Sequence, residues 1–190
     1  MNARRVPLLI VVILTSIVVR ADAPGLWRIE TGASSIVFEA VQAGARFEGR
    51  FERWAADVRF DPAALDASSA DVRIASDSAV TGNRDRDGTL ASKDFFAADS
   101  FPVARYVADR FEAADGGRYR ALGALTIRDV TREVPLLFTV TPEGDGFRLE
   151  GETVVQRLAF DLGATPDWQD TAWIGDDVTI RVRVLANGVD

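Results

Sequence analysis

Residues 123–140 read GALTIRDVTREVPLLFTV, and this stretch decides the fold class. Apolar residues and glycine occupy every second position on both sides of a polar centre, namely Gly123, Leu125, Ile127, Val134, Leu136, Phe138 and Val140. A period of two is typical of a β-strand with one buried face, whereas a helix would repeat every 3.6 residues. The stretch therefore predicts two half-buried strands of an antiparallel sheet.

The same alternation recurs along the chain, in residues 36–39, 47–51, 57–60, 71–75 and 178–184. Turn residues separate these segments, including Asp61-Pro62 and Asp115-Gly116-Gly117. We expect a single all-β domain with about eight antiparallel strands, arranged as a closed barrel or a sandwich. Residues 81–99 lack the alternation, and there we expect a loop followed by a short helix over Leu90 to Phe96.

The amino terminus has the features of an export signal. Arg4 and Arg5 precede a charge-free run of 14 residues, Val6 to Val19, which is short for a membrane span. Small residues then flank Asp22 in an A-x-A pattern. We predict that residues 1–23 are a signal peptide cleaved after Ala23, that residues 24–190 form the domain, and that the protein is periplasmic or otherwise exported. The alternative is a retained membrane anchor.

Composition excludes several classes of function. The chain of 190 residues contains no His and no Cys, which excludes serine-histidine triads, cysteine nucleophiles, disulfides and zinc sites built from thiolate or imidazole. Its net charge of −7 would become −9 on cleavage, because three arginines and Asp22 leave with the signal peptide. We therefore expect neither nucleic acid nor anionic membrane surfaces as partners, since both require basic patches.

Two polar patterns could carry chemistry. Asn83, Asp85 and Asp87 precede Gly88 with the spacing of a calcium-binding loop, but arginines stand between them, so a polar, self-paired loop at the barrel mouth is the favoured interpretation. The abundant Asp and Glu residues could form a catalytic pair, yet no spacing marks one. A carboxylate-dependent hydrolase stays open as an alternative, and we predict no enzymatic activity, no cofactor and no metal.

The apolar interior is the third candidate site. Most of the 11 Phe fall on faces predicted to point inward, alongside Trp54, Trp168 and Trp173. A barrel of about eight strands can fill its interior with such side chains or hold one ligand there. Periodicity does not distinguish a filled core from a binding cavity.

With these residues in view, the chain resembles the YceI-like, polyisoprenoid-binding family over nearly all of its mature length. No single motif is specific, but the set occurs in the family's order. The resembling segments are Ser35-Ile36-Val37-Phe38, Phe60-Asp61-Pro62, Thr81-Gly82 with Arg86-Asp87, Asp94-Phe95-Phe96 with Phe101-Pro102, Gly123-Ala124-Leu125-Thr126-Ile127 with Val130-Thr131, Gln156-Arg157 with Phe160, and Asp167-Trp168-Gln169-Asp170.

The resemblance implies a lipocalin-like barrel whose apolar interior holds a long-chain isoprenoid, a quinone or a related lipid. It implies that the Thr81 to Phe96 segment helps frame the cavity. The expected ligand-binding residues are Phe38, Phe47, Phe51, Phe60, Ile74, Leu90, Phe95, Phe96, Phe101, Leu125, Ile127, Phe138 and Trp168, with Arg84, Arg86 and Arg157 as candidates for contacting a polar head group.

The resemblance also bears on partners and alternatives. Some relatives are linked to membrane b-type cytochromes, so such a cytochrome is a candidate partner, and a homodimer is left open. Family members often carry histidines near the first strand and a glycine where this chain has Asp129, so a family role for histidine has no counterpart here. The expected function is lipid carriage or storage, and the alternative beside a hydrolase is a structural or stress-related exported barrel with a filled core.

Overall fold

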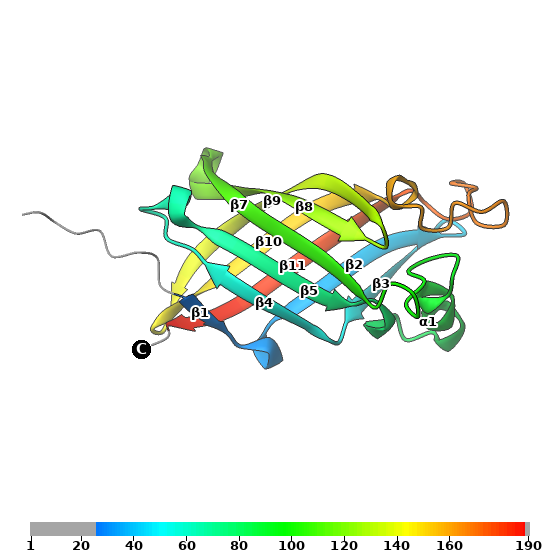
Figure 1. Cartoon of the computed structure of the whole chain (residues 1–190), viewed down its shortest axis with the longest axis horizontal. Coiled ribbons are helices and arrows are strands. Elements are labelled where there is room, and N and C mark those ends of the chain that lie inside the picture. The colour runs from blue at the N-terminus through cyan, green and yellow to red at the C-terminus, as the bar shows by residue number, and fades with distance from the viewer. Residues whose placement is uncertain (1–25, 189–190) are drawn as a thin grey trace, which may run out of the picture.

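The computed structural model describes residues 26–188, and the predicted signal peptide lies outside them. The chain forms an elongated, twisted barrel with a short helix beside one end (Figure 1). Among the described residues, no helix is long and apolar enough to cross a bilayer. The elements are β1 (Leu26–Ile29), β2 (Ser35–Gln42), β3 (Ala45–Phe51), β4 (Trp54–Arg59), β5 (Ser69–Ala75), β6 (Ala79–Val80), α1 (Arg84–Ala91), β7 (Val103–Ala114), β8 (Arg118–Ile127), β9 (Val130–Glu143), β10 (Gly146–Gln156) and β11 (Asp177–Gly188).

The strands form one antiparallel sheet that closes because β11 pairs with both β10 and β1. Three long strands are interrupted, so that β1 continues as β2, β3 as β4, and β5 as β6. Backbone hydrogen bonds span the breaks, from Glu52 N to Ser78 O at 3.0 Å and from Ala75 N to Arg53 O at 2.9 Å. The result is an up-and-down barrel of 8 strands, which confirms the predicted fold class.

The two faces of the barrel follow the alternation in the sequence. Along β8, Ala121, Gly123, Leu125 and Ile127 are buried, and the residues between them are half-buried. The outer face carries cross-strand ion pairs, such as Arg181 with Glu152 at 2.9 Å and Arg183 with Glu150 at 2.8 Å. Exposed pairs of this kind contribute at most about 1 kcal/mol each. Stability must therefore come mainly from the apolar interior.

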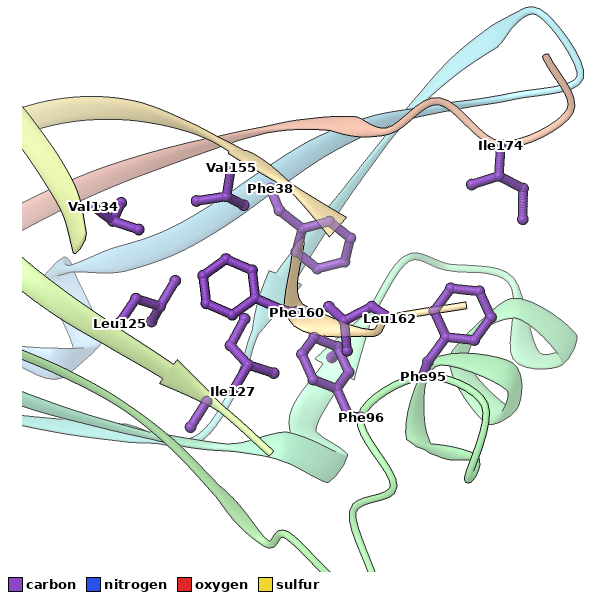
Figure 2. Packing of buried hydrophobic residues seen from close by; sticks show 12 residues of the cluster. Phe38, Phe95, Phe96, Leu125, Ile127, Val134, Val155, Phe160, Leu162 and Ile174 are labelled. Atoms are coloured by element: carbon purple, nitrogen blue, oxygen red, sulfur yellow. The ribbon is translucent and has the colours of Figure 1, made fainter. Parts of the chain in front are cut away.

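Two clusters of buried side chains fill the two ends of the interior. The first lies beside α1 and is built around Phe38, Phe96 and Phe160 (Figure 2). The second lies toward the far end and is built around Phe60, Phe138 and Phe147. We call them the lid-side cluster and the far cluster.

The segment 81–99 differs from the sequence prediction in detail. A short helix is present, as expected, but it precedes the turns: α1 spans Arg84–Ala91, and the residues after it form tight turns. Asn83 caps the helix by accepting hydrogen bonds from the backbone N–H groups of Asp85 and Arg86, both 3.1 Å. Trp173, expected in the interior, is 51% exposed because the chain there crosses the barrel rim instead of following a strand.

Candidate ligand-binding site

A cavity of about 130 Å³ lies inside the barrel and touches both clusters. Its lining includes Trp54, Ala56, Ile74, Phe111 and Val182, together with Ile36, Val58, Phe60, Ala70, Val72, Ala121, Leu125, Val134, Leu136, Phe138, Leu149, Ile180 and Val184. Tyr106 and Thr153 are the lining residues with polar side chains, and no carboxylate is among them. An apolar chain is therefore the ligand that this interior suits.

Tyr106 is the principal polar group at the cavity. Its hydroxyl donates to the carbonyl oxygen of Val134 at 3.1 Å, and the carbonyl of Ala121 lies 3.4 Å away. The ring lies across Gly123, where a Cβ would stand only 2.3 Å from the tyrosine Cζ. The absence of a side chain at Gly123 thus leaves the space that the Tyr106 ring occupies. Burial of the hydroxyl raises the pKa of Tyr106 to about 12.

This pKa shift makes stability depend on alkaline pH. An unfolded tyrosine loses its proton near pH 10 whereas Tyr106 holds it until about pH 12, so the free energy of unfolding should fall between these values. The expected loss between pH 9 and pH 11.5 is about 2 kcal/mol. Urea unfolding at pH 9 and pH 11.5 measures it, and the fall should be smaller in Tyr106→Phe. An equal fall in Tyr106→Phe and in the control Tyr119→Phe would contradict the assignment.

Aromatic rings close the far end. Phe60 contacts the rings of Phe111, Tyr119, Phe138 and Phe147, with centroid distances of 5.1 to 6.2 Å. Its backbone is also held, because its carbonyl accepts a 3.0 Å hydrogen bond from Trp27 Nε1. The far end is sealed by a packed and anchored cluster.

Two connections cover the other end, and we call them together the lid. One is residues 84–101, and the other is residues 157–176, which joins β10 to β11. Gly163 N donates to Asp94 O at 2.7 Å and so ties the two parts together. Phe160 extends from the second part into the lid-side cluster, between β8 residues and Phe38, as Figure 2 shows.

Arg157 holds the second part of the lid in place. Its guanidinium donates to five backbone carbonyls, those of Leu162, Gly163, Trp168, Ile174 and Gly175, at 2.8 to 3.1 Å. The residue is 3% exposed, and burial lowers its pKa while Asp176 acts in the opposite direction. All five donors of an arginine are thereby used. Arg157 organises the lid and has no donor left for a ligand.

A second pocket, which we call the mouth pocket, lies between the β2–β3 hairpin and the two parts of the lid, with α1 on one side. It has a volume of about 300 Å³ and is lined by Gln42, Phe47, Asn83, Asp85, Arg86, Thr89, Leu90, Phe95, Trp168 and Ile174. Arg86 donates to Thr81 Oγ1 at 2.9 Å and to Gln42 Oε1 at 3.2 Å, and its guanidinium carbon lies 3.9 Å from the centre of the Phe47 ring. The mouth pocket is aromatic with a mixed polar rim.

The polar side chains of Asn83 and Asp87, which were also considered as calcium ligands, have partners within the segment 81–99. Asn83 Oδ1 is occupied in capping α1, and Asp87 Oδ1 accepts from Thr81 N at 2.8 Å and from Thr81 Oγ1 at 2.6 Å. These contacts assign Asn83 and Asp87 to the start of α1 and to the turn that precedes it. The segment is polar and lies at the barrel mouth, as the favoured interpretation held, but Arg86 and Asp87 both pair with Thr81 and not with each other.

The expected ligand-binding residues divide among several locations, and Arg157 lies in the lid. The structure brings Phe60, Ile74, Leu125 and Phe138 to the central cavity, and Phe47, Arg86, Leu90, Phe95 and Trp168 to the mouth pocket. Phe38, Phe51, Phe96 and Ile127 pack in or against the lid-side cluster between the two spaces. Phe101 lies outside these groups, near Arg128, and Arg84 is exposed. The three candidate arginines are not brought together.

Some residues at the site were missed from sequence. Phe160 lies after a strand, in a stretch where the alternation has ended. Tyr106 was not considered as a site residue. A glycine on the inward face, such as Gly123, can indicate that a neighbouring aromatic ring occupies the space of a side chain. Arg128 was also missed: it adopts a φ of 59° at the β8–β9 turn and donates to Asp161 O at 3.0 Å. It therefore joins the turn to the lid.

Fold and site together define a class of protein: a closed antiparallel barrel with an apolar interior and a covered end. The chain belongs to the YceI-like domain family, whose model matches residues 27–186. A UPF0312 protein of Pseudomonas savastanoi pv. phaseolicola is 30% identical over 98 residues, 52% of this chain and 50% of its own length. The chain thus spans about half the length of the curated relatives it matches.

Solved structures agree on the fold. Burkholderia cenocepacia BcnA is 30% identical with a TM-score of 0.79, and the match covers 83% of this chain and 98% of that one. A polyisoprenoid binding domain from Saccharophagus degradans, implicated in plant cell wall breakdown, has a TM-score of 0.65 at 14% identity, with 87% and 99% covered. At that identity, the second likeness concerns the fold alone.

Proposed function

We propose that this protein is an exported carrier that holds the chain of an isoprenoid, quinone or related lipid in its central cavity and performs no chemistry on it. The observation that carries the proposal is an interior apolar on every side, with Tyr106 and Thr153 as its polar residues. Burying one isoprene unit contributes roughly 4 kcal/mol gross at about 0.8 kcal/mol per methylene-sized group. A membrane buries the same lipid chain equally well, so the lipid should prefer the protein over the membrane by only a small free energy. A small preference allows a carrier both to take up the lipid and to release it.

The cavity is small in this conformation. Its volume of about 130 Å³ lies below the roughly 300 to 1,000 Å³ of typical ligand pockets and near that of an engineered cavity that holds benzene. It therefore has room for about one isoprene unit. A longer chain must displace side chains of the lid-side cluster, where Phe160, Phe96 and Phe38 stand between the cavity and the lid.

The mouth pocket favours an uncharged head group. Arg86 is the one arginine among its lining residues, and Asp85 lines the same space, so the local charges balance. A diphosphate would need several cationic donors, whereas a quinone carbonyl or an alcohol needs one donor and an apolar wall. Phe47, Phe95 and Trp168 supply that wall.

Export and partners belong to the same proposal. The charge pattern of residues 1–23 supports export with cleavage after Ala23. A membrane b-type cytochrome as the receiving partner and a homodimer stay predictions from the family resemblance. The filled-core alternative gains some support from the small cavity, whereas a carboxylate-dependent hydrolase finds no Asp or Glu in the cavity lining.

Extraction of the protein purified from its native host tests the proposal. Organic solvent should release one long-chain lipid per barrel, identified by mass spectrometry. A filled-core protein would give an empty extract and would also ignore added isoprenoids. Turnover of a lipid ester that is lost on changing a single Asp or Glu would favour the hydrolase instead.

A further inference from the structure

The barrel wall is incomplete on one side. Pairing between β9 and β10 runs from Glu143 opposite Gly146 to Leu137 opposite Glu152, and it ends there. Beyond that point, β9 residues 130–136 pair only with β8, and β10 residues 153–156 pair only with β11. Two strand edges therefore face each other without a ladder between them, and we call this gap the split.

Sequence and surface both reflect the split. Pro135 lies on the unpaired stretch of β9, and a proline, which has no N–H, is tolerated where a strand edge needs no donor. A surface hollow of about 350 Å³ lies over the gap and includes Pro135, Val154, Gln156 and Phe160 in its lining. Val154, on β10, is 54% exposed there.

Buried side chains, of which Phe160 is the largest, close the split from within. The turn Arg157–Phe160 contacts both β9 and β10, and Phe160 is 2% exposed. Val134 lines both the surface hollow and the central cavity, so the hollow and the cavity are separated by a single layer of side chains. The backbone of this turn is anchored by Arg157 and by Asp176, which accepts from Leu158 N at 2.9 Å. An opening at the split would therefore come from movement of side chains such as Phe160 and not of this backbone.

We propose that the split is the opening through which the ligand's chain enters the barrel, and that Phe160 is the residue that controls its passage. This inference rests on the proposed function and adds a route to it. Entry at the far end would require the ring cluster around Phe60, with its four ring contacts, to come apart. Entry at the lid end would require the lid to lift, and Arg157 holds the lid through hydrogen bonds to five backbone carbonyls. At the split, by contrast, side chains such as Val134 and Phe160 separate the hollow from the interior, and no strand pairing has to be broken.

Cross-linking tests the route, because the chain contains no native Cys. In the full chain, a flexible, reducible thiol cross-linker joins Pro135→Cys to Val154→Cys across the split. The control joins Thr139→Cys to Glu150→Cys, which oppose each other where β9 and β10 are paired. Stopped-flow quenching of tryptophan fluorescence by a decyl-tailed benzoquinone reports both association and release.

Closing the split should slow association and release by about tenfold or more, with full recovery on reduction, whereas the control cross-link should change neither. Phe160→Ala should accelerate both rates. Unchanged rates in the cross-linked split, with quinone still bound, would overturn the lateral route and leave the carrier function standing. If the wild-type protein binds no quinone or isoprenoid at all, the proposed function fails, and the route fails with it.

Discussion

Replacing Arg157 with methionine should lower the free energy of unfolding by about 3 to 5 kcal/mol. The side chain is 3% exposed and satisfies the carbonyls of Leu162, Gly163, Trp168, Ile174 and Gly175. Methionine fills part of the space but donates no hydrogen bond, so these carbonyls must find water or stay unpaired. Urea unfolding followed by circular dichroism measures the loss.

Two variants make this prediction specific. Arg157→Lys should recover only part of the stability, because an ammonium offers three donors from one point where the guanidinium offers five in a plane. Arg84→Met, at an exposed position of α1, should change stability by less than about 0.5 kcal/mol. If Arg157→Met is no more destabilising than Arg84→Met, Arg157 does not organise the lid.

Most strands were predictable because the sheet of the barrel has one face toward solvent and one toward the apolar interior. β8 and β9 must alternate to satisfy both faces, and the sequence shows that alternation directly over residues 123–140. β7 and β10 were not predicted as strands. The interruptions that divide β1 from β2 and β5 from β6 were not predictable, since they depend on contacts with neighbouring strands. The helix was placed too late because Asn83 was weighed as a calcium ligand when its role is to cap α1.

The site was less predictable than the fold. Alternation shows that Phe60 and Phe138 point inward, but whether they line a cavity or pack against each other depends on distances that no pattern encodes. Arg157 belongs to one of the segments that resemble the family. Its five backbone partners lie in a loop without periodicity, so its role in holding the lid could not be predicted from the sequence. The split is equally invisible, apart from Pro135 in a strand.

Filling the cavity should abolish lipid binding without unfolding the barrel. Ala56 lies on β4 and lines the cavity, so its replacement by phenylalanine places a ring inside it. The volume of the cavity is close to that of an engineered protein cavity that holds one benzene molecule. We expect the Kd for a long-chain quinone to rise by about a hundredfold or more, the equivalent of about 2.8 kcal/mol. The free energy of unfolding should stay within about 1.5 kcal/mol or increase, since a void is filled.

The neighbouring Ala55 provides the matched control. It follows Trp54 on the same strand but is exposed, so Ala55→Phe adds the same ring to the outer face. Its Kd should equal that of the wild-type protein, as measured by quenching of tryptophan fluorescence. Equal binding by Ala56→Phe and Ala55→Phe would place the ligand somewhere other than this cavity.

Native mass spectrometry of the intact barrel, after incubation with a long-chain polyprenol, tests the central claim most directly. The claim is that the apolar interior between the lid-side cluster and the far cluster holds one lipid chain. Wild-type protein and Ala55→Phe should each show an adduct of one polyprenol per chain, and Ala56→Phe should show none. Wild-type protein that stays free of lipid at every polyprenol concentration would contradict the account and leave a barrel with a filled core.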